Sequence, residues 1–236
     1  MTAAPDFDHF IAANEYGFYC IPRSFRGRLV PRLLQKGEVY EPATLRFMQR
    51  QMGSGDVITG GAFVGDFFPA LALALTPGAR IHSFEPAPNS LAAARHTLAL
   101  NHLTCVDLHP VAVGAAEATL PLQVTRKDGA LAAGAKLVEG VSEDTIDVPV
   151  KTLDSLVPED RTVTILHLDI EGHELQALQG ATRLIRDHAP IIIAEAGKRS
   201  RRMAIGTYLR ETFPDHGYIA TSVVEENCVF LPVAKR

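Results

Sequence analysis

Three carboxylates stand close together at a point where the chain passes from one predicted element to the next. Asp169, Glu171 and Glu174 follow an apolar, β-branched run at 163–168 and begin a helical pattern. In an open parallel sheet, ligands bind in the crevice outside the carboxyl ends of the strands. Acids at a helix start also cap the helix and complement its dipole, so one acid there would be ordinary. Three acids in so short a stretch, with Gly172 among them, favour a functional site.

A glycine-rich turn marks a second place where a ligand can be held. The turn runs from Gly60 to Gly65, between a short predicted strand at 57–59 and a predicted helix at 66–75. It would bring a nucleotide-like ligand to the N-terminus of that helix. Glu85 ends the next predicted strand, 20 residues after Gly65. An acid at that place can accept hydrogen bonds from both ribose hydroxyls, and we favour this role over that of an exposed turn residue.

The spacing of the glycines bears on which ligand the turn accepts. A dinucleotide turn has glycines at its first, third and sixth positions, whereas here the third position is Ala62 and the adjacent pair is Gly60-Gly61. A pyrophosphate would therefore miss the small residue that it needs. A single-nucleoside cofactor without phosphates fits better, and S-adenosylmethionine is the candidate. An NAD-dependent oxidoreductase is the weaker alternative, because the chain also has no Tyr-x-x-x-Lys pair.

The remaining elements must hold these turns at one edge of a sheet. Predicted strands alternate with predicted helices, which indicates βαβ units and a mostly parallel sheet covered on both faces. The predicted strands lie at 57–59, 80–84, 105–109, 163–168 and 191–195, and the predicted helices at 42–52, 66–75, 89–100 and 204–213. Residues 218–231 predict a hairpin that adds an antiparallel edge strand. We expect one Rossmann-like α/β domain over residues 41–236.

Two stretches are less regular. Residues 1–40 are predicted to form an N-terminal arm packed by its aromatic side chains. The arginines of this arm can either be solvated, which is the preferred interpretation, or cap the site and receive an anionic group. Further along, residues 120–124 predict an added strand, and residues 127–141 predict a mobile loop.

Composition narrows the class of protein. The chain has 236 residues and a formal net charge of −4, which argues against general attraction to nucleic acid or to anionic membranes. Its three cysteines show no metal-binding or disulfide spacing. The N-terminus has no signal-peptide pattern, and the longest apolar run is interrupted by Pro69. These features predict a cytoplasmic protein without a metal site. The alternative is a divalent cation held by the hard oxygen ligands of Asp169, Glu171 and Glu195.

Several motifs occur in an order that resembles the FkbM family of methyltransferases. They are Gly61-Ala62-x-x-Gly65-Asp66, Phe84-Glu85-Pro86, Asn101, the run at 151–156, the run at 168–174 and Glu195. The resemblance covers roughly residues 40 to 200. It implies a class I, S-adenosylmethionine-dependent fold with a seven-stranded sheet, and O-methylation of hydroxyls on sugars or natural products. The sequence departs from the family at Thr59, where Asp is usual, and at Phe63, where Asn is usual.

The expected roles of individual residues follow from the two turns and from this resemblance. An alcohol is a weak nucleophile near neutral pH, so a nearby base would assist the reaction. The expected catalytic residues are Asp169, Glu171 and His173, whereas His167, inside a buried strand, is expected to be structural. The expected cofactor-binding residues are Gly60, Gly61, Ala62, Gly65, Asp66, Glu85, Asn89 and Glu41.

For the residues on the acceptor side of the site, the sequence leaves two roles open. Glu195 ends the fifth predicted strand and either faces the acceptor or caps a helix. The basic run at 198–202 is most simply a solvated loop. It can also reach over the acceptor, in which case Arg199 and Arg201 would bind phosphate or carboxylate. The expected partner is a small-molecule or sugar acceptor that can be anionic. A module that binds the cofactor without catalysis remains the alternative to an enzyme.

Overall fold

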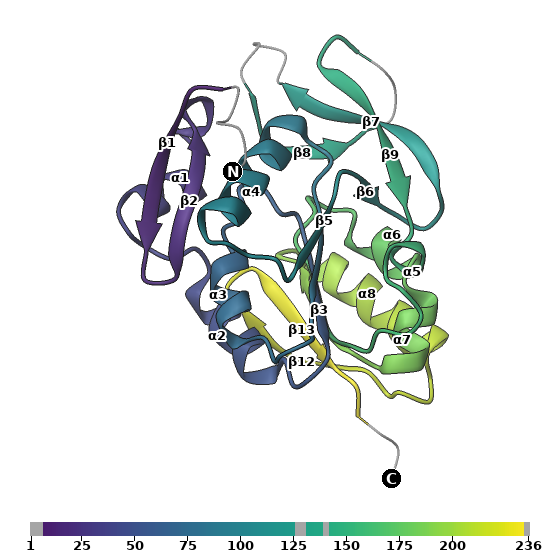
Figure 1. Ribbon diagram of the computed structural model, residues 1–236. Coiled ribbons are helices and arrows are strands. Elements are labelled where there is room, and N and C mark those ends of the chain that lie inside the picture. Colours follow the sequence, from purple (N-terminus) through teal and green to yellow (C-terminus); the bar gives the residue numbers. More distant parts are fainter. Residues whose placement is uncertain (1–6, 126–130, 139–141, 234–236) are drawn as a thin grey trace.

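The computed structural model describes residues 7–125, 131–138 and 142–233 and contains a central seven-stranded sheet (Figure 1). The strand order is β12-β13-β11-β10-β3-β4-β5, parallel from β11 to β5, with β13 antiparallel to both of its neighbours. The strands are β3 (Asp56–Gly60), β4 (Ile81–Phe84), β5 (Val106–His109), β10 (Val163–Leu168), β11 (Ile191–Glu195), β12 (Ile219–Val224) and β13 (Asn227–Leu231). The predicted Rossmann-like sheet with a C-terminal antiparallel hairpin is confirmed.

The register of the central strands aligns their carboxyl ends. Leu168 of β10 is level with Gly60 of β3 and with Ala194 of β11, and Gly60 is level with Phe84 of β4. Parallel strands in such register finish at the same edge of the sheet. The residues that follow, or that end the strand, therefore meet at this edge: Gly61, Glu85, Asp169 and Glu195.

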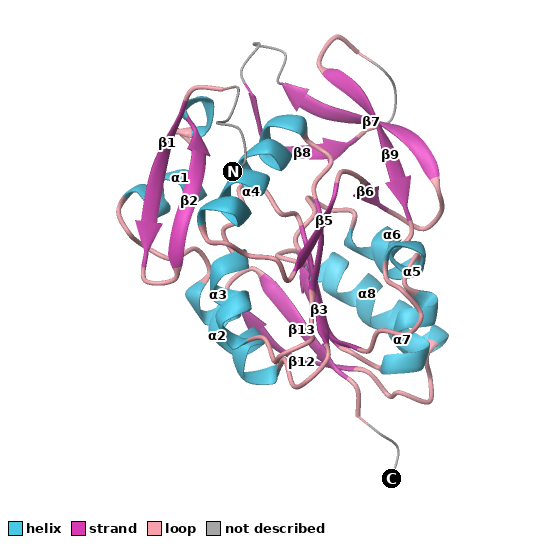
Figure 2. Cartoon of the chain, in the orientation of Figure 1, coloured by secondary structure: helices cyan, strands magenta, loops and turns pink. Residues whose placement is uncertain are grey.

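Helices cover both faces of the sheet (Figures 1 and 2). Neighbouring residues of β10 face opposite ways, so Ile165 packs with α2 and α3 while Leu166 packs with the later helices. This two-sided burial explains why the strands read as continuous apolar runs. The helices of the first face are α2 (Pro42–Gln51), α3 (Phe68–Ala74) and α4 (Pro88–Leu100). Those of the second face are α5 (Leu153–Leu156), α6 (Glu174–Gln179), α7 (Thr182–His188) and α8 (Arg199–Thr212).

The N-terminal residues are more regular than the sequence predicts. Strands β1 (His9–Asn14) and β2 (Gly17–Pro22) pair as an antiparallel hairpin, followed by the 3₁₀ turn η1 (Arg23–Phe25) and helix α1 (Leu29–Gln35). The hairpin is joined to the end of α4. The backbone N–H of Phe18 donates to the Asn101 Oδ1 over 2.9 Å, and Asn101 Nδ2 donates to the Phe18 carbonyl oxygen over 2.6 Å.

A small second sheet stands between β5 and β10 in the sequence. Its order is β6-β9-β7-β8, with β6 (Ala112–Val113), β7 (Ala118–Thr125), β8 (Leu131–Leu137) and β9 (Thr145–Lys151). The added strand predicted at 120–124 is confirmed as part of β7. The loop predicted at 127–141 is wrong over 131–137, where β8 pairs with β7. The rest of that predicted loop, apart from Val138, lies outside the described residues.

Helix α4 begins one residue before the predicted position, and two other helices begin further from theirs. Helix α3 begins at Phe68 rather than at 66, because Gly65 has a φ of +78° and the chain is still turning there. Helix α8 begins at Arg199 rather than at 204, so the basic run is helical from its second residue. No helix within the described ranges is long and apolar enough to cross a membrane.

Candidate functional site

A cavity of about 310 Å³ lies at the carboxyl ends of β3, β4 and β10. The turn after β3 and the acidic turn after β10 line it, and so do residues 28–30, which are the N-cap and the first two residues of α1. Leu122 and Leu137 of the small sheet add an apolar wall. Most of the residues predicted for the cofactor and for catalysis line this space: Gly60, Gly61, Ala62, Asp66, Glu85, Asp169, Glu171 and His173.

Two glycines shape the turn after β3. Gly61 has a φ of +79°, and a Cβ there would overlap the backbone carbonyl oxygen of Asp169. Only glycine lets the turn approach the acidic turn so closely. Gly65 also has a positive φ, and a Cβ there would lie 2.8 Å from the Phe68 ring. Gly65 is not a lining residue, so its position in the structure is that of a turn former at the start of α3.

The Glu85 carboxylate is held by two backbone N–H groups. Phe63 N–H donates to Oε2 over 2.8 Å, and Ala87 N–H donates to Oε1 over 2.9 Å. Burial raises the pKa of Glu85 to about 7, although these hydrogen bonds and the charge of Arg28 act in the opposite direction. Each carboxylate oxygen can accept more than one hydrogen bond, so the ribose hydroxyls of a ligand can still bind here.

Thr59 and His167 form a polar pair in the floor of the cavity. Thr59 Oγ1 lies 2.9 Å from His167 Nδ1, and the imidazole stacks on Phe67 with ring centroids 5.3 Å apart. Burial lowers the pKa of His167 to about 4, so the ring is neutral. Both residues line the cavity. His167 is therefore packed as expected for a structural residue, and it also borders the site, which the sequence analysis did not predict.

The acidic turn after β10 is folded around one of its own acids. Glu174 Oε1 accepts the backbone N–H of Ile170 over 3.2 Å and that of Gly172 over 2.9 Å. Glu174 is buried, with 2% exposure, and serves the backbone. Glu171 takes a left-handed φ of +57° and is exposed at the cavity, a conformation that costs energy for a residue with a side chain.

Asp169 and His173 are the two remaining titratable residues of this turn, and their pKa values are shifted in opposite directions. Burial, and next the charge of Glu195, raise the pKa of Asp169 well above its usual range. Glu195 lies at the end of the neighbouring strand, and burial likewise raises its pKa. Burial lowers the pKa of His173, so that its ring is neutral near pH 7 and can accept a proton. Among the described residues no cluster of three or more His, Cys, Asp or Glu is arranged to hold a metal ion.

Besides Gly65, two predicted cofactor residues lie outside the lining. Asn89 is exposed on the first turn of α4, and the next residue, Ser90, lines the cavity instead. Glu41 lies behind the cavity, where its Oε2 accepts from Asn227 Nδ2 over 2.7 Å. Burial raises the pKa of Glu41 to about 7, and its charge in turn raises the pKa of Asp169. Tyr40, beside Glu41, reaches the lining and was missed from the sequence.

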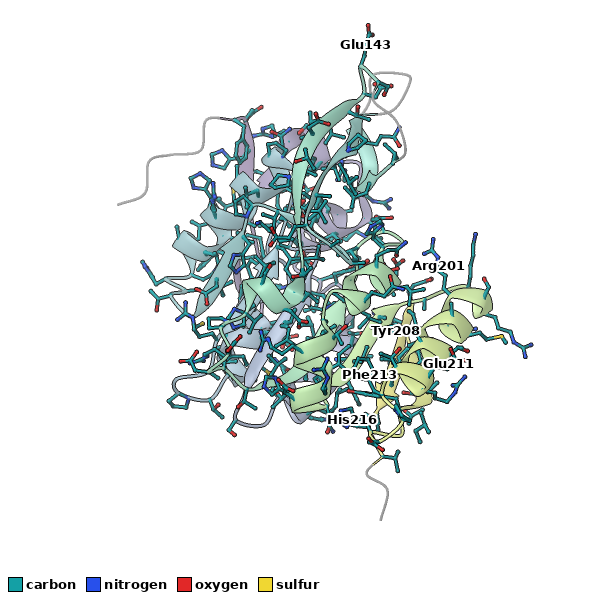
Figure 3. The ribbon with its side chains drawn as sticks, turned by 90° about the vertical axis from the view of Figure 1, so that its right-hand side faces the viewer. Glu143, Arg201, Tyr208, Glu211, Phe213 and His216 are labelled. Atoms are coloured by element: carbon teal, nitrogen blue, oxygen red, sulfur yellow. The ribbon has the colours of Figure 1, made fainter. Side chains whose placement is uncertain are left out.

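The predicted acceptor arginines point to different places. Arg201 lies near the beginning of α8, above Tyr208 in Figure 3. A Cβ on Gly172 would be 2.9 Å from Arg201 Nη2, so this guanidinium covers the acidic turn. Arg199 is exposed and lines a separate groove between α8 and β12. Neither arginine, nor Glu195, lines the cavity itself.

Comparison with known families agrees with this geometry. The family described as methyltransferase FkbM domain matches residues 60–220, which is more than half of the chain. The chain belongs to this family. FkbM methyltransferases use S-adenosyl-L-methionine, and it is the cofactor of this chain. No curated protein sequence matches the chain.

Solved structures with the same fold include another FkbM protein. The methyltransferase FkbM from Methylobacillus flagellatus KT aligns with a TM-score of 0.54 and 22% identity, over 75% of this chain. This chain spans only 43% of that protein. A methyltransferase from Geobacter sulfurreducens gives a TM-score of 0.47 and 15% identity, over 83% of this chain and 82% of the other. A putative rRNA methylase from Clostridium thermocellum gives 0.48 and 11%, over 82% and 94%.

The lining of the cavity fits the cofactor of the FkbM family. Glu85 offers a fixed carboxylate for ribose hydroxyls, with no bulky residue at Gly61 to block the approach. Asp66 offers a carboxyl group that, when ionised, suits the positive charge of an ammonium or sulfonium group. The cavity is also of the size typical for small-molecule sites.

Proposed function

We propose that this chain is an O-methyltransferase that acts on a hydroxyl of a sugar or natural product. The observation that carries the proposal is that one cavity is lined both by Glu85 and by the turn from Asp169 to His173. A residue suited to a nucleoside and a group of candidate bases therefore border the same enclosed space. The apolar wall of Leu122 and Leu137 suits the body of a small acceptor.

The residues of the acidic turn would handle the proton of the acceptor hydroxyl. When bound, S-adenosyl-L-methionine supplies an electrophilic methyl group. His173 is the better base, because it is neutral near pH 7 and a ring nitrogen can accept the proton. Asp169, whose raised pKa favours the protonated acid, would orient the hydroxyl by hydrogen bonding. Glu171, exposed at the same turn, would bind the acceptor at the mouth.

The chemistry of the surroundings limits the class of acceptor. Four of the described acids line the cavity, and the chain carries a net charge of −4, so a nucleic acid is not the expected substrate. Arg201 covers the acidic turn from outside and would receive an anionic group of the acceptor, such as a phosphate or carboxylate.

A cytoplasmic location remains the expectation from the sequence.

Calorimetric titration followed by a turnover assay tests the proposal. The protein is first titrated with S-adenosylhomocysteine and, separately, with NAD. It is then incubated with S-adenosyl-L-methionine and a panel of neutral sugars, sugar phosphates, uronates and hydroxylated natural products. We expect binding of S-adenosylhomocysteine only, and acceptor-dependent formation of an O-methyl product identified by mass spectrometry and NMR. Binding without turnover on any acceptor would favour the non-catalytic module, and a methylated nitrogen in the product would refute O-methylation.

A further inference from the structure

Arg28 brings a positive charge from the N-terminal segment into a cavity lined by acids. It is the one arginine or lysine among the described residues that line this space. Its guanidinium carbon lies 4.2 Å from the centre of the Phe25 ring and 5.4 Å from that of the Phe63 ring. The two rings stack with centroids 5.2 Å apart. Arg28 thus rests on an aromatic shelf, formed by Phe25 and Phe63, that joins the N-terminal segment to the turn after β3.

The shelf and the Glu85 carboxylate form one structural unit. Phe63 has a φ of +45°, which is unfavourable for a residue with a side chain. In this conformation its N–H donates to Glu85 Oε2 while its ring packs on Phe25. The same residue therefore fixes both the carboxylate and the surface that supports Arg28.

Glu85 interacts electrostatically with an acid, Asp66, and with a cation, Arg28. Burial raises the pKa of Asp66, on the turn before α3, and the charges of Glu41 and Glu85 raise it further. Arg28 is the opposing cation, since its charge lowers the pKa of Glu85 against the larger effect of burial. Burial lowers the pKa of Arg28, and the charges of Glu85 and Glu171 raise it. Without Arg28, only the backbone N–H groups of Phe63 and Ala87 would oppose the effect of burial on Glu85, and its carboxylate form would be less favoured.

We propose that Arg28 is a positioning residue for the cofactor: it closes the ribose end of the cavity and places a positive charge beside Glu85. The charged carboxylate is the stronger acceptor for ribose hydroxyls, so Arg28 strengthens cofactor binding through Glu85. This inference rests on Glu85 being the ribose ligand, a role that has its own test below.

The other arginines of the segment provide matched controls. Arg23 lies outside the cavity and pairs with Asp8, with 3.0 Å between nitrogen and oxygen and both side chains mostly exposed. Arg26 is exposed, two residues before Arg28, and does not line the cavity. Neutralising Arg26 removes the same charge from the same segment without touching the site.

The test measures S-adenosylhomocysteine binding by calorimetry at pH 7 and pH 9 for the wild type and five variants. The variants are Arg28→Gln, Arg28→Lys, Arg26→Gln, Glu85→Gln and the double variant Arg28→Gln/Glu85→Gln. We expect Arg28→Gln to weaken binding about tenfold at pH 7 and about twofold or less at pH 9, where Glu85 is ionised in either protein. Ratios of variant to wild type at each pH cancel the ionisation of the ligand itself. Arg28→Lys should bind better than Arg28→Gln at pH 7, and Arg26→Gln should match the wild type.

The double variant separates an effect through Glu85 from lost packing. If Arg28 acts through Glu85, its replacement should change binding little once Glu85 is already neutral. The proposal is overturned if Arg28→Gln binds within twofold of the wild type at pH 7, or if it weakens binding equally at both pH values. A wild type that does not bind at all would instead contradict the cofactor assignment, and a Glu85→Gln variant with full affinity would contradict the ribose role of Glu85.

Discussion

Glu85→Gln is the substitution that most directly tests how the cavity holds its cofactor. The change preserves volume and removes the charge from a side chain that is 6% exposed. Hydrogen bonds from ribose hydroxyls to a charged acceptor contribute roughly 1.5–3 kcal/mol to binding. We therefore expect S-adenosylhomocysteine to bind about tenfold to a hundredfold more weakly.

The effect on stability has two opposing parts. A glutamine amide nitrogen cannot accept a hydrogen bond, so the N–H of either Phe63 or Ala87 loses its acceptor, at a cost of about 1–3 kcal/mol. Burial raises the pKa of Glu85 from 4.5 to about 7, and at pH 8 this disfavours the folded carboxylate by roughly 3 kcal/mol, a cost that glutamine removes. The two contributions nearly cancel, and the melting temperature at pH 8 should change by only a few degrees.

Asp154→Asn is the control for this prediction. Asp154, in α5, also accepts two backbone N–H groups, those of Arg183 and Leu184 at the start of α7 over 2.8 and 3.0 Å, but it does not line the cavity. The variant should lose about 0.5–2 kcal/mol of stability and keep wild-type affinity for S-adenosylhomocysteine. The reasoning about Glu85 is refuted if folded Glu85→Gln binds as tightly as the wild type in calorimetry, or if Asp154→Asn loses as much affinity.

Three further predictions concern catalysis, pH and the acceptor. Asp169→Asn and Glu171→Gln should lower the turnover rate, measured by product formation, far more than the cofactor affinity, measured by calorimetry. Near-wild-type rates in both variants would show that the acidic turn is structural. As the pH falls from 8 to 6.5, the free energy of unfolding of the cofactor-free protein, measured in urea, should rise by roughly 2 kcal/mol. The reason is that three acids with pKa values of about 7 in the folded protein bind protons that the unfolded chain does not bind. Those acids are Glu41, Asp66 and Glu85. The lowered pKa values of His96, His109, His167 and His173 oppose this gain increasingly as the pH falls below about 7, so a flat profile between 7 and 8 would contradict the burial of the acids. Arg201→Ala should raise KM for an anionic acceptor more than for a neutral one. The control Arg199→Ala, on the other side of α8, should change neither KM. Equal changes in the two KM values of Arg201→Ala would show that Arg201 does not recognise the charge of the acceptor.

The sequence alone determined those features of the protein that depend on the succession of strands and turns along the chain. The turn at 60–65, Glu85 and the turn at 169–174 each follow a buried strand, and parallel strands finish at a common edge. Their meeting around one cavity thus followed from the alternation of apolar runs and helical patterns. The close approach at Gly61 belongs here as well, because a glycine beside a strand end signals such an approach.

The basic run at 198–202 shows how tertiary contacts override local preference. The sequence favoured a loop because four cations in five residues are usually solvated. Cations at a helix N-terminus also oppose the helix dipole. In the structure α8 begins at Arg199, and Arg202 Nη1 donates to the carbonyl oxygens of Ala196 and Gly197 over 3.1 Å each. Arg201 lies against Gly172, and the buried face of the helix packs on the sheet. These contacts lie outside the local pattern on which the helix boundary was predicted.

The N-terminal hairpin and the entry of Arg28 into the cavity were decided only by the tertiary structure. The hairpin is fixed by a pair of hydrogen bonds between Phe18 and Asn101, 83 residues apart in the chain. Arg28 reaches the cavity because Phe25 stacks on Phe63, a partner on a different turn. Periodicity reports which face of an element is buried, but it carries no information about which distant side chain will cover it. Such pairings depend on the complementary shapes and charges of surfaces that exist only after the chain has folded.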